Sequence, residues 1–232
     1  VEELEDIDHT HMVVYTGHND FGNALQQERF PGLYGGIVAR MRRVLEHSQT
    51  YCRMRRALSK VPKVKFGTGE RMGFTPQRRE ATLNYLRSNL ERMLWLSKQR
   101  GVQMIIATPV TSFLRKPIHD VCLKKQCSYE LWQQGKAMGR ADPIISERKM
   151  RLSHDIDWDS LRAPTMAVQM IREFAQSNSI PLIDVEADLN REPGLNVPQD
   201  RLFKDMIHFN QNGHQVVGEL FAQEFKAQNL LQ

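Results

Sequence analysis

The sequence predicts an α/β protein whose open parallel sheet is covered by helices on both faces. Three short apolar runs, at residues 12–16, 102–108 and 180–185, have the β-branched composition of buried parallel strands. Helical patterns separate the runs, and this alternation favours right-handed crossovers that place helices on both faces of the sheet. In such a sheet, binding and catalytic side chains gather at the carboxyl ends of the strands.

The first predicted strand, residues 12–16, runs directly into the polar turn Gly17-His18-Asn19-Asp20. The side-chain amide of Asn19 can donate a hydrogen bond to an oxyanion that develops at a reacting carbonyl. Because the strand is apolar on both faces, it would be an exposed edge without a neighbour. We therefore expect a missing segment, another chain or a second copy to pair with it.

The second strand follows a helix and ends at the same rim. Thr75-Pro76 is typical of a helix start, with proline at the first helical position, and Gly101 is typical of a helix end. Strand 102–108 then leads to Pro109 at the rim. The helix before it presents an apolar stripe made of Leu83, Leu86, Leu90, Met93 and Leu94.

The same plan repeats before the third strand. A helix is predicted to start near Pro164 and to end at a turn over residues 177–179, where strand 180–185 begins. A last helix is predicted over about residues 211–228. The first of these helices buries Met166, Met170, Ile171 and Phe174, and the last buries Val217, Leu220, Phe221 and Phe225.

With 232 residues, of which 41% are hydrophobic and 25% charged, the chain has the length and composition of one globular domain. Residues 30–74 show helical pieces but no strand pattern, which favours an insertion into a single domain spanning residues 1–232. Residues 117–159 favour one short helix, at about residues 119–134, followed by a loop punctuated by Gly and Pro.

The net charge of +5 is concentrated in residues 40–79, which carry twelve Lys or Arg and two Glu. We interpret this run as a solvated helix and loop within the insertion. The alternative is a surface for anionic lipid or polyanionic glycan. Nucleic acid is disfavoured, because neither interleaved aromatic residues nor a recognition motif accompanies the charge.

The cysteines Cys52, Cys122 and Cys127 follow no metal-ligand spacing. We interpret Cys122 and Cys127 as free thiols, with a disulfide as the alternative in an oxidising compartment. The chain shows neither a signal peptide nor an apolar run long enough to cross a membrane. Residues 1–8 are acidic and lack an initiator Met, which indicates a processed, trimmed or excised product. Export, membrane anchoring and a cytoplasmic location therefore all stay open.

Asp205 and His208 lie three residues apart, just before the last predicted helix. At this spacing the carboxylate can accept the ring N–H and fix the tautomer that a general base needs. A pair of this kind usually serves a nucleophile. The alternative is a capping arrangement in which Asp205 or Asn210 caps the helix and His208 only packs.

Together these motifs resemble those of the SGNH/GDSL hydrolases, a flavodoxin-like α/β superfamily of esterases, lipases, thioesterases and carbohydrate deacetylases. The resemblance lies in residues 17–20 after a strand and in residues 205–208 before a helix. Residues 157–163 and 183–185 also look like the branch whose Asn block reads Gly-His-Asn-Glu, with Asp20 in place of the Glu.

The resemblance implies a Ser-His-Asp ester hydrolase that needs no cofactor and acts on an ester or acetylated substrate. His208 would be the general base and Asp205 its orienting carboxylate. Asn19 would be the side-chain oxyanion donor, and Gly17 would let the loop backbone pass close to the substrate. Further substrate contacts would come from His18, Asp20 and Pro109.

The sequence departs from the family at the nucleophile. The family places a Gly-Asp-Ser block and a second oxyanion Gly before the Asn block, whereas here the Asn block already begins at Gly17. We therefore expect the C-terminal portion of a longer hydrolase, a flavodoxin-like sheet without its first strands, with the nucleophilic Ser on a segment absent from this chain. The alternatives are a non-catalytic module that binds an anionic lipid or glycan surface and, as a minor one, Ser112 as a replacement nucleophile.

Overall fold

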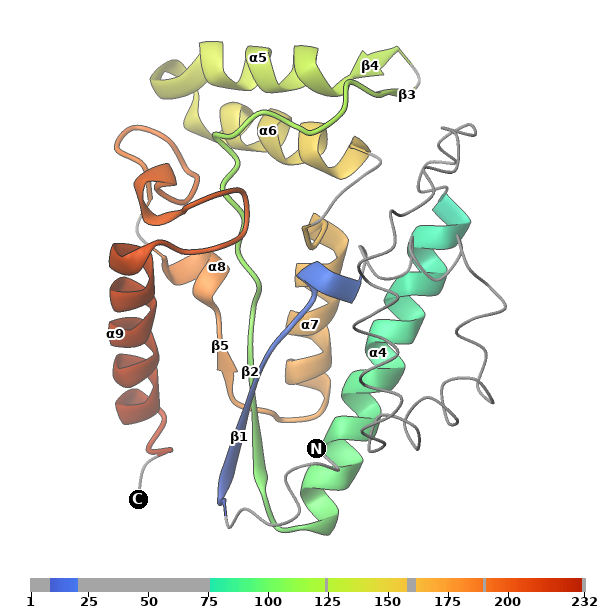
Figure 1. The fold of residues 1–232 in the computed structure, drawn as a ribbon, viewed down its shortest axis with the longest axis vertical. Helices are drawn as coiled ribbons and strands as arrows, with labels where there is room; N and C mark the ends of the chain where they lie inside the picture. Colours follow the sequence, from blue (N-terminus) through green and yellow to red (C-terminus); the bar gives the residue numbers. More distant parts are fainter. Residues whose placement is uncertain (1–8, 21–75, 124, 158–161, 190, 231–232) are drawn as a thin grey trace, which may run out of the picture.

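The sheet of this protein is parallel and lies between two layers of helices. The computed structural model describes residues 9–20, 76–123, 125–157, 162–189 and 191–230. Within them, three strands pair in the order β1-β2-β5 (Figure 1). Their bounds are His11–Tyr15 for β1, Gln103–Ala107 for β2 and Leu182–Ile183 for β5. Met12 pairs with Met104, and Ala107 pairs with Ile183. The predicted α/β class and parallel sheet are confirmed.

Helices cover both faces of the sheet (Figure 1). One face packs against α4 (Pro76–Gln99) and α7 (Thr165–Ser177), and the other against α8 (Val185–Asp188) and α9 (Gln211–Ala227). Successive strand side chains point to opposite faces. β2 therefore supplies Met104 and Ile106 to the first core and Ile105 and Ala107 to the second.

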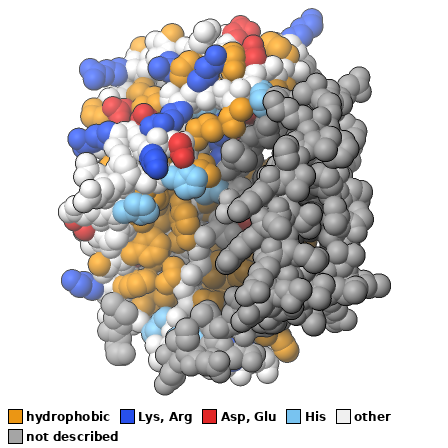
Figure 2. Space-filling model, viewed as in Figure 1, with side chains coloured by type: hydrophobic (Ala, Val, Ile, Leu, Met, Phe, Trp, Pro, Cys, Tyr) orange, Lys and Arg blue, Asp and Glu red, His pale blue; other side chains and the backbone are white. Residues whose placement is uncertain are grey.

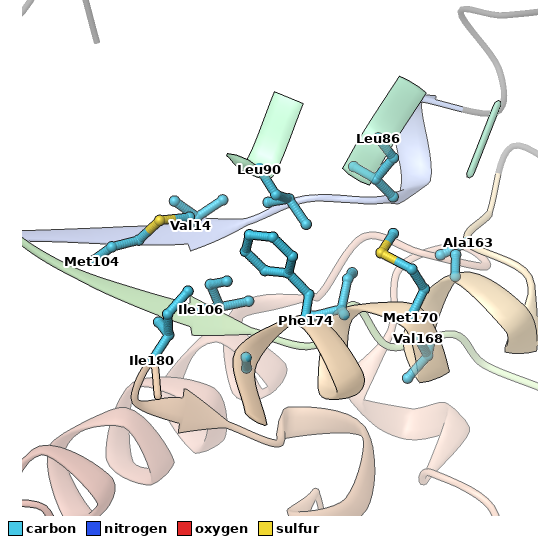
Figure 3. Close-up of a cluster of buried hydrophobic side chains, with 13 residues drawn as sticks. Val14, Leu86, Leu90, Met104, Ile106, Ala163, Val168, Met170, Phe174 and Ile180 are labelled. Carbon is cyan, nitrogen blue, oxygen red and sulfur yellow. The ribbon is translucent and has the colours of Figure 1, made fainter. Parts of the chain in front are cut away.

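The first core joins both of its helices to the strands. In Figure 3, Phe174 of α7 and Leu90 of α4 point toward each other beside the strand residues Val14 and Ile106. The stripe predicted for α4 is confirmed, because Leu86 and Leu90 are buried and the other three residues pack against the same core. In the second core, the four apolar residues predicted for α9 are partly buried.

Two predictions about α7 and β5 need correction. Met166 is 45% exposed, because the buried arc of α7 centres on Ala167, Ile171 and Phe174 and leaves Met166 outside it. The third strand is also shorter than the predicted 180–185, because the chain enters α8 at Val185.

The segment 117–159 contains more regular structure than predicted. Residues 122–123 pair antiparallel with residues 126–127, and the predicted helix starts only at Ser128. The predicted loop is wrong, because a second helix occupies most of it. Asp142 accepts the backbone N–H of Ile145 at 3.0 Å, and Pro143 takes the first helical position, which is the start signal that the sequence interpretation missed. The elements are β3 (Cys122–Leu123), β4 (Gln126–Cys127), α5 (Ser128–Met138), a 3-10 turn (Gly139–Ala141) and α6 (Pro143–Ile156).

A disulfide joins Cys122 to Cys127, so the interpretation of these residues as free thiols is wrong. The hairpin explains the bond, because its register places Cys122 directly opposite Cys127. The short spacing in the sequence did not reveal that the two cysteines lie on paired strands. Cys52 and the predicted insertion at residues 30–74 lie outside the described residues. In the part of the chain that the structure describes, no helix has the length and apolarity needed to span a bilayer.

A buried carboxylate, Glu186, joins the sheet to the helices around it. It is 4% exposed, and Arg172 of α7 donates to its Oε2 at 2.7 Å and to both oxygens of Asp184 at 2.7 and 2.9 Å. Arg151 of α6 donates to Oε1, and Nη1 of Arg191 lies 3.7 Å from the same oxygen. Burial raises the pKa of Glu186, but the adjacent arginines outweigh burial and hold the pKa below its ordinary value.

Thr108 ties the ends of β2 and β5 to this cluster. Its hydroxyl donates to Asp184 Oδ1 at 2.9 Å and accepts the backbone N–H of Glu186 at 3.0 Å. Asp184 also accepts the backbone N–H of Ala187 and so caps α8. The carboxyl edge of the sheet is therefore held by side chains as well as by strand pairing.

Glu186→Ala is expected to lower the free energy of unfolding by about 1.5–3 kcal/mol, because partly buried Arg151 and Arg172 each lose a charged hydrogen bond while keeping a second carboxylate partner. The matched control is Glu173→Ala, at an exposed residue of α7 whose carboxylate accepts from Gln169 on the same helix. The control should change stability by less than about 0.5 kcal/mol. Urea denaturation followed by circular dichroism measures both, and equal losses would contradict the role assigned to Glu186.

Candidate active site

The loops that follow β1 and β2 pack against each other at the carboxyl edge of the sheet. Gly17 has a φ of +125°, and a Cβ on it would lie 3.0 Å from Cγ of Pro109 and 3.4 Å from Cβ of Ala163. The residue therefore allows an approach that a side chain would block. Tyr15 adds a second link, because its hydroxyl accepts the backbone N–H of Val110 at 3.2 Å.

His18 is a buried and neutral imidazole. Its Nδ1 accepts the backbone N–H of Ala163 at 3.0 Å, so the neutral ring carries its proton on Nε2. Burial lowers the pKa of His18 to about 4; the Val110 backbone opposes this effect, and the charges of His208 and Arg162 add to it. Nε2 is buried, and no partner meets hydrogen-bonding geometry within the described residues. His18 therefore stays uncharged at neutral pH.

The sequence predicted a turn here, but residues 18–20 lie in a helix that follows β1 (Figure 1). Asn19 is exposed, and its amide makes no hydrogen bond to a described residue. Asp20 accepts a hydrogen bond from the hydroxyl of Thr16 at 3.1 Å, which links this helix to the end of β1. The Ala163 N–H donates to His18, and the adjacent Arg162 donates to Sδ of Met206 at 3.1 Å. Residues 162–163 therefore contact both the residues after β1 and the segment before His208.

Asp205 and His208 form the hydrogen-bonded pair that their spacing predicted. Nδ1 of His208 lies 2.7 Å from Oδ2 of Asp205, while Oδ1 accepts the backbone N–H groups of Ile207 and His208 at 2.9 and 2.8 Å. A carboxylate on Nδ1 fixes the tautomer in which Nε2 has a free lone pair. The side chains are 69% and 50% exposed, so the pair orients the ring and adds little to stability.

The Asp205 carboxylate remains ionised over a wide pH range. Partial desolvation raises its pKa, but hydrogen bonds from the Ile207 and His208 backbones and from the imidazole together lower it to about 2. Asp205 therefore caps its own turn and holds the ring at the same time. The helix itself is capped by Asn210, which accepts the backbone N–H of Gly213 at 3.0 Å.

The start of α9 lies directly against the segment that carries this pair. A Cβ on Gly213 would lie 2.0 Å from the carbonyl oxygen of Leu202, which is too close for any side chain. Asn210 strengthens the contact, because its amide donates to the Arg201 carbonyl at 2.7 Å. The backbone of residues 200–210 is thus fixed against the helix.

Ser112 is not a replacement nucleophile in this structure. Its side chain is 0% exposed, and its hydroxyl donates to Oδ1 of Asp200. Arg115 donates to the same oxygen at 2.8 Å. The sequence interpretation overlooked Arg115 and Asp200, because no local motif relates residues this far apart. Among the described residues, no group of three His, Cys, Asp or Glu side chains is placed to hold a metal ion.

Comparisons with known proteins give limited similarity. No protein-family model matches the sequence, and no curated protein matches it significantly. A GDSL-like lipase from Bacteroides thetaiotaomicron VPI-5482 shares 14% identity and a TM-score of 0.37, over 62% of this chain and 53% of its own. A protein assigned as an acylhydrolase from Bacteroides fragilis NCTC 9343 shares 15% identity and a TM-score of 0.37, over 63% and 52%. The chain spans about half the length of each, and similarity this low assigns no function.

His18→Asn is expected to remove a pH dependence of stability. The folded pKa of about 4 is below the ordinary 6.5, so the unfolded chain binds the proton first as the pH falls. Wild-type stability from this group is complete above about pH 6.5 and is lost by about pH 4, a change of roughly 3 kcal/mol. Asn can still accept the Ala163 N–H but does not titrate. Urea denaturation from pH 4 to 8 tests this, and parallel profiles for the two proteins would contradict it.

Gly213→Ala is expected to destabilise the protein by about 1–3 kcal/mol, because the new methyl group meets the Leu202 carbonyl. Gly218→Ala is the matched control on the same helix, where a Cβ meets no atom within 4 Å. It should raise stability by up to about 1 kcal/mol through helix propensity. Thermal unfolding measures both, and a stabilising Gly213→Ala would show that the close contact is absent.

Proposed function

We propose that this chain belongs to the SGNH/GDSL hydrolases and supplies the base, the orienting acid and the oxyanion donor of a Ser-His-Asp ester hydrolase. The observation that carries the proposal is the hydrogen bond of 2.7 Å between Asp205 and His208. The substrate is an ester or acetylated compound, and the chemistry requires no cofactor.

His208 acts as the general base. Asp205 holds the Nδ1 proton, so the exposed Nε2 can take the proton of an attacking hydroxyl and return it to the leaving group. The pKa of about 2 keeps Asp205 ionised, which stabilises the imidazolium that forms during the step. His18 does not compete for that proton, because burial lowers its pKa to about 4 and makes it a weak base.

Asn19 donates to the oxyanion of the tetrahedral intermediate. Its exposed amide is not engaged by another described side chain. A donor aimed at this charge typically lowers the barrier by about 3–4 kcal/mol. Gly17 contributes through its backbone, since its φ of +125° lets the loop lie close to Pro109.

The nucleophile is a Ser on a segment absent from this chain, placed beside β1. Among the described strands β1 pairs with β2 alone, and its Val13 and Tyr15 are 41% and 39% exposed. Figure 2 shows hydrophobic side chains gathered on this face of the molecule. A parallel strand here would end at the rim near His208. The Ser oxygen would bond to the acyl carbon as the ester C–O bond breaks, and water would then release the acid.

A non-catalytic module that binds an anionic surface is the alternative. It depends on the basic run at residues 40–79, most of which lies outside the described residues. At Arg79 of this run, burial lowers the pKa of the guanidinium, and the charges of Asp155 and Asp157 oppose this effect. A salt titration separates the two functions: binding that weakens strongly with salt, in a form without esterase activity, favours the module.

The prediction concerns an N-terminally extended form of the chain that hydrolyses a short-chain p-nitrophenyl ester. His208→Ala is expected to lower its kcat about 10⁴-fold or more, and Asp205→Asn by a similar factor, because each removes the oriented base. Asn19→Ala should lower kcat about 10²- to 10³-fold. The assay is initial-rate kinetics with each folded variant.

His214→Ala is the matched control, because His214 is an exposed imidazole in the first turns of α9 with its ring against Phe209. It should leave kcat unchanged. Full turnover in the His208→Ala protein would overturn the proposed function.

A further inference from the structure

The segment that precedes His208 is held by one guanidinium group. Arg115 donates from Nε to Asp200 at 2.8 Å, from Nη1 to the Lys204 carbonyl at 3.0 Å and from Nη2 to the Phe203 carbonyl at 3.1 Å. All three acceptors lie within the six residues that precede Met206. Arg115 itself follows β2, so it connects the centre of the sheet to this segment.

The two carbonyl contacts determine where the Asp205–His208 pair lies. The Phe203 carbonyl belongs to the same peptide group as the N–H of Lys204, which donates to the His208 carbonyl at 2.8 Å. The Lys204 carbonyl belongs to the peptide group that leads into Asp205. Because peptide groups are planar, a hydrogen bond on the carbonyl fixes the N–H on the other side. Arg115 thus fixes two peptide groups of the turn at residues 204–208: the one whose N–H closes the turn onto His208, and the one that leads into Asp205.

Ser112 strengthens the same connection. Its backbone N–H donates to the Met206 carbonyl at 2.9 Å, and its hydroxyl donates to the Asp200 oxygen that Arg115 also contacts. The Asp200 carboxylate is 38% exposed and Arg115 is 33% exposed, so their ion pair alone would be weak. Its effect is geometric, because a planar fork with fixed donors specifies the position of its acceptors.

We propose that Arg115 is a positioning residue for the Asp205–His208 pair, acting through the backbone of residues 203–208. The guanidinium sets the turn in which Asp205 reaches Nδ1 of His208. This inference rests on the proposed function for its catalytic meaning, but the positioning itself can be measured without any activity.

The test is Arg115→Lys in the full chain, which keeps the positive charge near Asp200 but loses the fork that reaches two carbonyls. Long-range ¹H–¹⁵N correlation spectra of the His208 ring, at a pH where the ring is neutral, give the fraction of molecules with the proton on Nδ1. The wild type should hold the proton on Nδ1. Arg115→Lys should lower this fraction about twofold or more, toward the Nε2–H form that free imidazole side chains prefer.

Arg201→Lys is the matched control, since Arg201 is exposed in the same segment and its side chain donates to Gln199. It should leave the tautomer unchanged. In a form with esterase activity, Arg115→Lys should lower kcat about tenfold with little change in KM. Absence of esterase activity in every form would remove the proposed function, while a tautomer shift would still support the positioning role.

A folded Arg115→Lys protein with the wild-type tautomer would overturn the proposal. If this variant does not fold, Arg115→Gln takes its place, because its single amide cannot reach both the Phe203 and Lys204 carbonyls. A fall in the Nδ1–H fraction would then support the proposal, and an unchanged fraction would overturn it.

Discussion

The carboxyl edge of the sheet depends on the buried charge of Glu186. Among the described strands, β5 contributes only two residues to the sheet, so backbone pairing alone holds this edge weakly. A carboxylate that is 4% exposed is tolerable only with partners, and these come from α6, from α7 and from the segment after α8. Every one of these elements must be in place before the charge can be buried. The cluster therefore links the α5–α6 hairpin to the sheet beneath it (Figure 1).

The same edge of the sheet places two imidazoles in opposite environments. His18 is enclosed, accepts a backbone N–H and has its pKa lowered to about 4 by burial. His208 is 69% exposed and is held on one nitrogen by a carboxylate. Two ionisable groups of the same type can have different chemical roles when their burial and hydrogen-bond partners differ in this way. One ring supports the loop as a neutral group, and the other is open to exchange a proton.

The sequence predicted those features that depend on local pattern. Hydrophobic periodicity located β2, α4 and α9 to within about two residues, and the three-residue spacing of Asp205 and His208 predicted their hydrogen bond. It failed where distant segments decide the outcome. The disulfide between Cys122 and Cys127 follows from a hairpin, and the contact of Arg115 with Asp200 follows from two loops meeting across the sheet edge. The missed α6 is different, because the signal at Asp142-Pro143 was present and was outweighed by the Gly and Pro residues around it.

Capping and catalysis are not competing interpretations of Asp205. Oδ1 accepts two backbone N–H groups of its own turn, which fixes the plane of the carboxylate and leaves Oδ2 directed at Nδ1 of His208. The backbone therefore orients the Asp205 carboxylate, and the carboxylate in turn orients the His208 ring. The Asp205 and His208 side chains are mostly exposed, so the backbone turn, more than packing by other side chains, determines their relative orientation. That turn is held by Gly213 against Leu202 on one side and by the guanidinium of Arg115 on the other, which explains how a solvent-exposed imidazole can still be kept in one orientation.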